Sequence, residues 1–423
     1  MENINTEELL FKYKLALRII RKKIEIMYNK LNNNNDYNCI EHIKSRIKSM
    51  PSIHNKLIKN GYDITTENIK NKIHDIAGIR IICSFLKDIE TVERLIKQDK
   101  DIIITKRKDY ITTPKESGYS SLHLIVKIPV VLSDKKEYIE VEIQLRTIAM
   151  DMWASLEHKL CYKNKKVLDD KYKQFITDFS VTTRNIDYLM EKMIIESDKY
   201  NLKEQDRKQN VDKIKIIEQI SFLKYELAEK QLYEKIQNIS SELSNTKDIN
   251  PIEHIKSRIK KTYNIVTKLE KLNYEVTEEN MNYHIHDLVG IRIVCSFLSD
   301  LEEIKDIIEN DNSIIIIKRK NYIDNPKPNG YRSYHYNVLI PIKMNNKIEY
   351  VEAEIQIRTI AMDMWATLEH KICYKKSGNI PKKMKENLKE ISNYINIMDK
   401  RIDSIINGNK KDEIKKLELK KHM

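Results

Sequence analysis

The chain repeats its own sequence at a fixed offset of 212 residues, beginning with EHIKSRIK at residue 41 and again at residue 253. Identity is high in the two longest matching stretches: 26 of 45 positions agree between 41–85 and 253–297, and 22 of 27 agree between 137–163 and 349–375. No gap is needed between these stretches. A repeat of this length is a tandem duplication of a whole domain, not a short-period solenoid.

The duplication predicts two domains of similar size. We place the first at 1–200, a linker at 201–213 and the second at 214–423. The expected linker, NLKEQDRKQNVDK, holds seven charged residues and only two apolar ones, which is typical of a linker or of an exposed helical joint. At 423 residues the chain is long enough to bury a sizeable core without disulfides.

Each copy follows the order helix, strands, helices. Residues 6–31 carry apolar side chains at helical spacing, and segments near 89–97, 148–162 and 169–200 are also typical of helices. Between them GIRIICSF, DIIITKR, SLHLIVKIPVVL and EYIEVEIQLR are short runs rich in β-branched residues, which predict strands. This mixture predicts an α/β (α+β) fold with a mixed sheet and flanking helices, present twice.

Composition limits the function classes. The net charge of +13 favours polyanionic ligands such as nucleotides or RNA. The five cysteines form no CxxC pair and no metal-ligand spacing, and their odd number argues against a secreted disulfide framework. The N-terminus has no apolar signal core, and no uninterrupted apolar run reaches the roughly 18 residues of a membrane span. We therefore expect a soluble, cytoplasmic protein.

The run EYIEVEIQLR alternates between apolar and polar residues, so one face of this strand is polar. The polar face, Glu140, Glu142, Gln144 and Arg146, is identical in the second copy, whereas the apolar face has drifted; this difference favours a functional polar face. Asp75, before GIRI, either caps a turn or acts with Glu142, since two such carboxylates are suited to share one Mg²⁺. The second copy repeats the pair as Asp287 and Glu354.

Glycine is rare in this chain, with 7 residues where average usage of about 7% would give roughly 30. Gly118 and Gly330 are present at equivalent positions, each before a tyrosine in a loop. We expect a backbone there that needs positive φ or approaches a ligand closely. Tyr119 and Tyr331 are either packing residues or platforms on which a base stacks.

Phosphate binding must come from side chains, because the chain contains no GxxxxGK[ST] and no GxGxxG loop. Basic residues recur beside the carboxylates in both copies, which favours a polyphosphate site over a solvated face: Arg46, Lys48, Lys56, Arg80 and KRK at 106–108, then Arg258, Lys260, Lys268, Arg292 and KRK at 318–320.

Other chemistries have little support in the sequence. The helix containing Trp153 is most simply a core element, and there is no zinc-ligand cluster, no Gly-x-Ser-x-Gly elbow and no nucleophilic-cysteine motif. The His-Asp dipeptide at residue 74 is also found in metal-dependent phosphohydrolases, but the further helical His and Asp ligands of those enzymes are missing.

The motifs EHIKSRIK, HDIAGIRI, KRKDY, KESGY, VEIQLRT and WASLEH follow one another over most of the first repeat, and close counterparts occur in the same order in the second. Through these motifs, each half of the chain resembles the synthetase domain of the RelA/SpoT family. The resemblance is strongest to the small single-domain alarmone synthetases. The resemblance implies a nucleotidyltransferase-like mixed sheet that transfers the β,γ-pyrophosphate of ATP to the 3′-hydroxyl of GDP or GTP, making the stringent-response alarmones ppGpp or pppGpp. Nothing resembles the hydrolase, TGS or ACT regions of long family members, so we expect synthesis without built-in degradation or ribosome-dependent control.

The resemblance also implies roles for single residues on the acceptor side. Asp75 and Glu142 would hold Mg²⁺, and Glu142 would help to activate the 3′-hydroxyl. Tyr119 would stack on guanine, and His123 would lie near the acceptor phosphates. The same roles fall in the second copy to Asp287, Glu354, Tyr331 and His335.

On the ATP side the resemblance implies a second set of roles. Arg46 and Arg80 would sandwich the adenine, and Lys48 and Lys56 would bind the phosphates. The equivalent residues of the second copy are Arg258, Arg292, Lys260 and Lys268.

Three features depart from the family pattern. The first copy has GYSSLH where the second has the family-like GYRSYH, so Ser120 replaces an arginine and Leu122 a tyrosine; we expect a weaker first site or an altered acceptor preference. Lys108 and Lys320 stand where relatives often have arginine. The small synthetases are single-domain chains that commonly self-assemble, so we expect this fused pair to form an intramolecular pseudo-dimer or a homo-oligomer.

Two other functions stay open at this level. A toxic relative would pyrophosphorylate adenine nucleotides or tRNA 3′ ends, although the intact Gly-Tyr loop disfavours this. Alternatively the protein is an RNA-binding or scaffolding module with one inactive copy and single-stranded RNA as its partner, because a charge of +13 suits RNA. Retention of all four carboxylates argues against a complete loss of activity.

Overall fold

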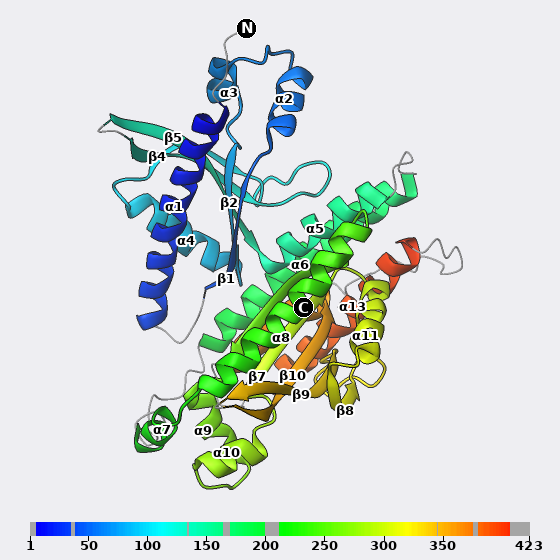
Figure 1. Cartoon of the computed structure of the whole chain (residues 1–423). Helices are drawn as coiled ribbons and strands as arrows, with labels where there is room; N and C mark the ends of the chain where they lie inside the picture. The colour runs from blue at the N-terminus through cyan, green and yellow to red at the C-terminus, as the bar shows by residue number, and fades with distance from the viewer. Residues whose placement is uncertain are drawn as a thin grey trace. The chain divides into compact units, whose positions relative to one another are not determined.

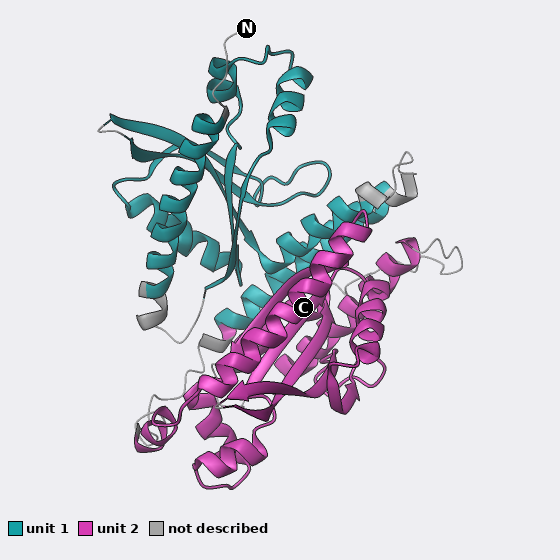
Figure 2. Ribbon diagram, viewed as in Figure 1, with its two compact units in different colours: residues 1–195, 419–423 teal, residues 196–418 magenta. Residues whose placement is uncertain are grey.

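A computed structural model of the chain describes residues 6–34, 39–132, 135–163, 170–198, 211–344, 346–374 and 380–406. Figure 2 colours its two compact units, residues 1–195 with 419–423 and residues 196–418. Most of the expected linker at 201–213 lies outside the described residues, and its last three residues begin helix α7 (Val211–Glu218). The expected domain limits therefore stay predictions.

Each unit is built on one five-stranded mixed sheet, which confirms the expected α/β fold and its duplication (Figure 1). The strands of the first unit are β1 (Ile40–Ile47), β2 (Ala77–Cys83), β3 (Ile103–Asp109), β4 (Leu122–Leu132) and β5 (Lys135–Thr147). They lie in the order β1-β2-β5-β4-β3, with β2 and β5 parallel and the other neighbours antiparallel. The second unit repeats this order with β6 (Ile252–Ile259), β7 (Val289–Cys295), β10 (Lys347–Thr359), β9 (Tyr334–Met344) and β8 (Ile315–Asn321).

Helices flank each sheet. The first unit contains α1 (Thr6–Asn34), α2 (Met50–Lys59), α3 (Thr66–Lys72), α4 (Leu86–Gln98), α5 (Ile148–Lys163) and α6 (Asp170–Asp198). After α7 the second unit contains α8 (Leu223–Thr246), α9 (Thr262–Lys271), α10 (Glu278–His284), α11 (Leu298–Asn310), α12 (Ile360–Tyr374) and α13 (Lys382–Ile406). Within the described ranges, no helix is long and apolar enough to cross a bilayer.

The apolar face of the first sheet is buried beneath α1 and α4 (Figure 1). The expected apolar side of β5 is buried there: Ile139, Val141, Ile143 and Leu145 are at most 9% exposed. They share one hydrophobic cluster with Ile20 of α1. Burying a branched aliphatic side chain contributes about 1.5–3 kcal/mol, so these contacts determine which face of the sheet is covered and which is left for polar side chains.

Helix α5 follows β5 directly and is the core element expected for this segment. Met150, Trp153, Leu156 and Leu160 are all buried, at no more than 4% exposure. The indole Nε1 of Trp153 donates to the carbonyl oxygen of Ile176 on α6 at 3.2 Å. Packing of this buried face therefore fixes the position of α5. It places the first turn of α5 at the end of the sheet, beside polar residues.

A buried aspartate joins α6 to the start of α5. The Thr147 hydroxyl donates to Asp187 Oδ2 at 2.6 Å and accepts from the backbone N–H of Met150 at 3.1 Å. Burial raises the pKa of Asp187 to about 7. The charge of Glu191 also acts to raise this pKa, whereas the hydrogen bond from Thr147 acts to lower it. The second unit repeats the contact between Thr359 and Asp399, whose pKa burial also raises to about 7.

These two raised pKa values predict that stability falls as the pH rises from about 4 to about 7. Between about pH 4 and pH 7 the folded chain keeps protons on Asp187 and Asp399 that the unfolded chain has lost, so the free energy of unfolding decreases through this window and levels off above it. Asp187→Asn/Asp399→Asn is expected to flatten this decrease in urea unfolding measured at each pH. Asp178→Asn, on the exposed side of α6, serves as the control, and an unchanged slope in the double variant would contradict the prediction.

Candidate active site

Polar side chains form rows across the second face of each sheet, opposite the apolar face, because residues in register on neighbouring strands point to the same side. One row takes a residue from each strand of the first sheet: Lys44, Arg80, Gln144, His123 and Lys108. The next row contains Arg46, Gly78 and Glu142. Strand register thus brings expected ATP-side and acceptor-side residues from distant segments onto one surface.

Asp75 lies in the turn between α3 and β2 and is paired with two lysines. Lys48 Nζ donates to its Oδ2 at 2.5 Å, and Lys56 Nζ, from α2, donates to its Oδ1 at 2.8 Å. Burial acts to raise the pKa of Asp75, but the two lysines outweigh burial and hold it below its usual range. In the second unit Lys260 and Lys268 lie 2.6 and 2.7 Å from Asp287, whose pKa is lowered to about 2.

Glu142 of β5 is held by two neighbours in the adjacent row. His123 Nδ1 lies 3.0 Å from its Oε1, and the amide of Gln144 donates to its Oε2 at 2.9 Å. Burial acts to raise the pKa of Glu142, but the contacts with His123 and Gln144 together outweigh burial, and the pKa is lowered. The second unit repeats these contacts with His335 and Gln356 at 2.8 and 2.6 Å from Glu354, whose pKa falls to about 2.

The two carboxylates of each unit lie close enough to interact electrostatically, since the charge of Asp75 acts to raise the pKa of Glu142 and Asp287 acts likewise on Glu354. Both are hard oxygen donors, which suits Mg²⁺. Among the described residues, no three His, Cys, Asp or Glu side chains are grouped as a metal cage. Mg²⁺ bound at this pair would take its other ligands from phosphates and water.

The loop before β4 is shaped by its glycine. Gly118 has φ +87°, which confirms the expected positive φ, and a Cβ there would lie 2.2 Å from Ser180 Oγ on α6. The close approach is thus to the chain's own helix. In the second unit Gly330 has φ +94°, and a Cβ would lie 2.6 Å from Ser392 Cβ.

Tyr119 is fixed between cations and a histidine. Its hydroxyl lies 2.8 Å from His123 Nε2 and accepts from Arg146 at 2.7 Å. Lys115 Nζ and Arg146 Cζ lie 4.9 and 5.0 Å from the ring centroid. The ring is half-buried, so it both packs and offers surface to a ligand. The second unit has the same arrangement of Tyr331, His335, Lys327 and Arg358.

Arg46 and Arg80, the expected adenine-binding pair, come from neighbouring strands. Arg46 lies across Gly78, where an added Cβ would contact its Cγ at 3.8 Å. Burial lowers the pKa of Arg80, and the nearby charges of Arg146 and Arg46 lower it further, against the attraction of Asp151. Two guanidinium groups therefore share one side of the site, which suits a planar ring or an anion.

Sequence reasoning missed Asp151, in the first turn of α5. Its Oδ1 accepts from Arg80 at 2.9 Å and from Arg146 at 3.1 Å. The helix was identified only as a core element, and a lone aspartate in a first turn is commonly a partner of the helix dipole. A signal was available, however, because Asp151 is the single acidic residue of the run IAMDMW that is identical in both copies.

The difference between GYSSLH and GYRSYH lies in how the loop is anchored. Arg332 donates to the carbonyl oxygen of Ile323 at 2.8 Å, and the hydroxyl of Tyr334 donates to Glu302 of α11 at 2.7 Å. In the first unit Ser120 Oγ is buried without a hydrogen-bond partner, and Leu122 is buried. The second loop therefore has two anchors that the first loop lacks, and the expected difference between the copies stays a prediction.

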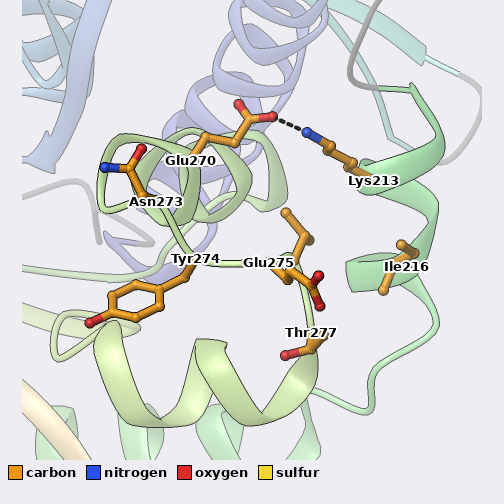
Figure 3. Close-up of a pocket in the computed structure, with 8 residues that line it drawn as sticks. Lys213, Ile216, Glu270, Asn273, Tyr274, Glu275 and Thr277 are labelled. Atoms are coloured by element: carbon orange, nitrogen blue, oxygen red, sulfur yellow. Dashed lines mark hydrogen bonds and ion pairs between the residues drawn. The ribbon is translucent and has the colours of Figure 1, made fainter.

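Figure 3 shows a pocket in the second unit between α7, α9 and the turn after α9. Lys213 closes one side of it through an ion pair with Glu270 at 2.6 Å. None of the expected site residues lines this pocket. The candidate site is instead the polar sheet face described above.

Fold and site together define a class of protein: a duplicated α/β domain whose mixed sheet carries paired carboxylates with lysines and arginines on one face. The sequence profile of the region found in RelA/SpoT proteins matches residues 45–167 and 257–379, once in each unit. These matches cover more than half of the chain. The chain belongs to the RelA/SpoT family, as the motifs predict.

Two curated relatives each match a length close to one copy. GTP pyrophosphokinase YwaC of Bacillus subtilis (strain 168) is 50% identical over 182 residues, which are 43% of this chain and 85% of the relative. GTP pyrophosphokinase YjbM of the same organism is 35% identical over 182 residues, 43% of this chain and 84% of the relative. The crystal structure of small alarmone synthetase 2 from Bacillus subtilis matches with 43% identity and a TM-score of 0.42, covering 45% of this chain and 99% of that one.

Proposed function

We infer that this chain is a GTP pyrophosphokinase that transfers the β,γ-pyrophosphate of ATP to the 3′-hydroxyl of GDP or GTP. The observation that carries this conclusion is the carboxylate pair with its two lysines, present in both units of a chain whose relatives are GTP pyrophosphokinases. Neither the adenine- or tRNA-directed alternative nor the scaffold gains support from these relatives.

The proposed chemistry rests on positioning and charge neutralisation, as phosphoryl-type transfer generally does. The 3′-oxygen attacks the β-phosphorus of ATP, the bond from that phosphorus to the α–β bridging oxygen breaks, and AMP leaves with the electron pair. Glu142, whose lowered pKa keeps it ionised, accepts the hydroxyl proton. His123 forms hydrogen bonds with Glu142 and with Tyr119. It thereby orients the carboxylate of Glu142.

We propose that Asp75 and Glu142 hold Mg²⁺, which would neutralise phosphate charge. Lys48 and Lys56 now bind both oxygens of Asp75, and on nucleotide binding they would turn to the ATP phosphates. Arg46 and Arg80 would bind the adenine. The second unit would use the equivalent set, Asp287, Glu354, Lys260, Lys268, Arg258 and Arg292.

On the acceptor side we propose that Tyr119 stacks on guanine while His123 lies near the phosphates, with Tyr331 and His335 in the same roles in the second unit. The cations over each tyrosine ring would also attract the acceptor phosphates. Single-stranded RNA binding, a pseudo-dimer or homo-oligomer and a cytoplasmic location stay predictions.

A turnover assay tests the function directly. Labelled ATP is incubated with the full chain and each of GDP, GTP, ADP and tRNA, with and without Mg²⁺. We expect Mg²⁺-dependent transfer to GDP or GTP and none to ADP or tRNA. Label on ADP or tRNA alone would favour the toxic relative, and salt-sensitive RNA binding without any turnover would favour the scaffold.

A further inference from the structure

We propose that Asp151 and its counterpart Asp363 are positioning residues that join the ATP side and the acceptor side of each site through one chain of hydrogen bonds. This inference rests on the function proposed above. Both aspartates lie in the first turn of a helix, α5 or α12, and are buried, at 6% and 5% exposure. Neither is assigned a direct contact with substrate.

A single carboxylate oxygen of Asp151 serves two guanidinium groups from different strands. Its Oδ1 accepts from Arg80 of β2 at 2.9 Å and from Arg146 of β5 at 3.1 Å. Its Oδ2 faces His42 Nε2 at 3.9 Å and Lys44 Nζ at 3.8 Å. The carboxylate therefore lies within a cluster of basic groups contributed by β1, β2 and β5.

The chain continues from Arg146 to the acceptor side. Arg146 donates to the hydroxyl of Tyr119 at 2.7 Å, and that hydroxyl lies 2.8 Å from His123 Nε2. The other nitrogen of His123 lies 3.0 Å from Glu142 Oε1. Asp151 thus connects the expected adenine-binding arginine with the expected guanine platform and with the proposed base.

Charge explains why the aspartate is needed at this point. Arg146 lies close enough to Arg80 to lower the pKa of Arg80 through like-charge repulsion. Arg146 itself is only 3% exposed. A buried guanidinium that loses its carboxylate partner is strongly destabilised. Without the charge of Asp151 the two groups would separate, and Arg80 would lose its orientation toward ATP while Arg146 would release Tyr119.

The second unit keeps this arrangement although its acceptor loop differs. Asp363 Oδ1 accepts from Arg292 at 2.9 Å and from Arg358 at 3.2 Å, with His254 and Lys256 at 3.8 and 4.0 Å. Burial acts to raise the pKa of Asp363, but Arg292, His254, Arg358 and Lys256 hold it well below its usual range. The aspartate network is thus the same in both units, while positions 120 and 122 have changed.

The test uses the full chain with only the second site active, in the Asp75→Ala background. Asp363→Asn keeps an oxygen acceptor and removes the charge. We expect the KM for ATP and the KM for GDP to rise together, each about tenfold, because one residue orients both sides. A merely structural role would lower the melting temperature and the active fraction and leave both KM values unchanged, which would overturn the proposal.

A matched control is Asp300→Asn in the same background. Asp300 is also a buried aspartate of the second unit, 9% exposed, and it accepts from the backbone N–H of Phe297 at the start of α11. It should cost stability without changing either KM. If Asp363→Asn does not fold, the equivalent pair Asp287→Ala and Asp151→Asn takes its place. A wild-type chain that makes no guanosine product would refute the proposed function, whereas product with unshifted KM values refutes only this inference.

Discussion

Replacing Asp75 and Asp287 together by alanine is expected to reduce guanosine product by about 1,000-fold or more, while either single variant keeps the activity of the other copy. Each substitution removes a proposed metal ligand and leaves two lysines without their carboxylate. Loss of a metal-ion contribution of about 4 kcal/mol to the transition state corresponds to about this factor. The measurement is Mg²⁺-dependent turnover of labelled ATP with GDP or GTP.

The repeat supplies a matched control at the same offset. Asp99 and Asp311 are equivalent aspartates that form ion pairs away from the site, with Lys23 at 3.0 Å and Lys235 at 2.7 Å. Their double alanine variant should keep turnover within about twofold, since partly exposed pairs contribute little. Full activity in the Asp75/Asp287 variant would exclude the proposed carboxylates, and loss with Asp287→Ala alone would show that only the second copy works.

Gly330→Ala is expected to destabilise the second unit by about 2–5 kcal/mol and to weaken binding of GDP there. Positive φ costs a residue with a side chain about 1–2 kcal/mol, and overpacking costs about 1–3 kcal/mol more. Both apply, because Gly330 has φ +94° and a Cβ would lie 2.6 Å from Ser392 Cβ. Tyr331 follows directly, so the distortion displaces the expected guanine platform. Chemical unfolding and GDP titration would measure the two effects.

Two further variants separate backbone strain from steric overlap. Gly61 has φ +74° and nothing within 4 Å of its virtual Cβ, so Gly61→Ala should show only the cost of positive φ. Ser392→Gly in the Gly330→Ala background should remove the overlap, although it also removes the hydrogen bond from Ser392 to the carbonyl oxygen of Gly330. Equal destabilisation by Gly61→Ala and Gly330→Ala would show that packing against α13 contributes nothing.

Local periodicity predicted the elements whose two faces differ clearly. In β5 buried and part-buried residues alternate from Ile139 to Leu145, so the two faces of this stretch follow from the sequence. In β1 the alternation does not hold: Ser45 lies between Ile43 and Ile47 on the apolar side, which weakens the pattern, and the strand was missed. Arg46 was nevertheless identified as a basic residue that recurs in both copies, and the family resemblance of EHIKSRIK implied its role in binding adenine.

Contacts between distant segments could not be predicted in the same way. Arg80 and Asp151 are 71 residues apart. The sequence pattern around Asp151 predicts only a helix of the hydrophobic core. Only the packing of α5 against β2 and β5 brings the two together. Likewise, the sequence predicted an unusual backbone conformation at Gly118. It did not predict the neighbour of Gly118, Ser180, which lies on the separate helix α6.

The sequence by itself determined the duplication, the alternating faces of the strands and the identity of the expected carboxylates, lysines and arginines, because each is a property of contiguous residues or of repeated motifs. Only the tertiary structure decided which groups meet. The strand order β1-β2-β5-β4-β3 places Arg46, Glu142 and His123 on one surface, and helix packing adds Asp151 to it. These neighbours depend on chain crossovers and strand register, which local sequence patterns do not specify.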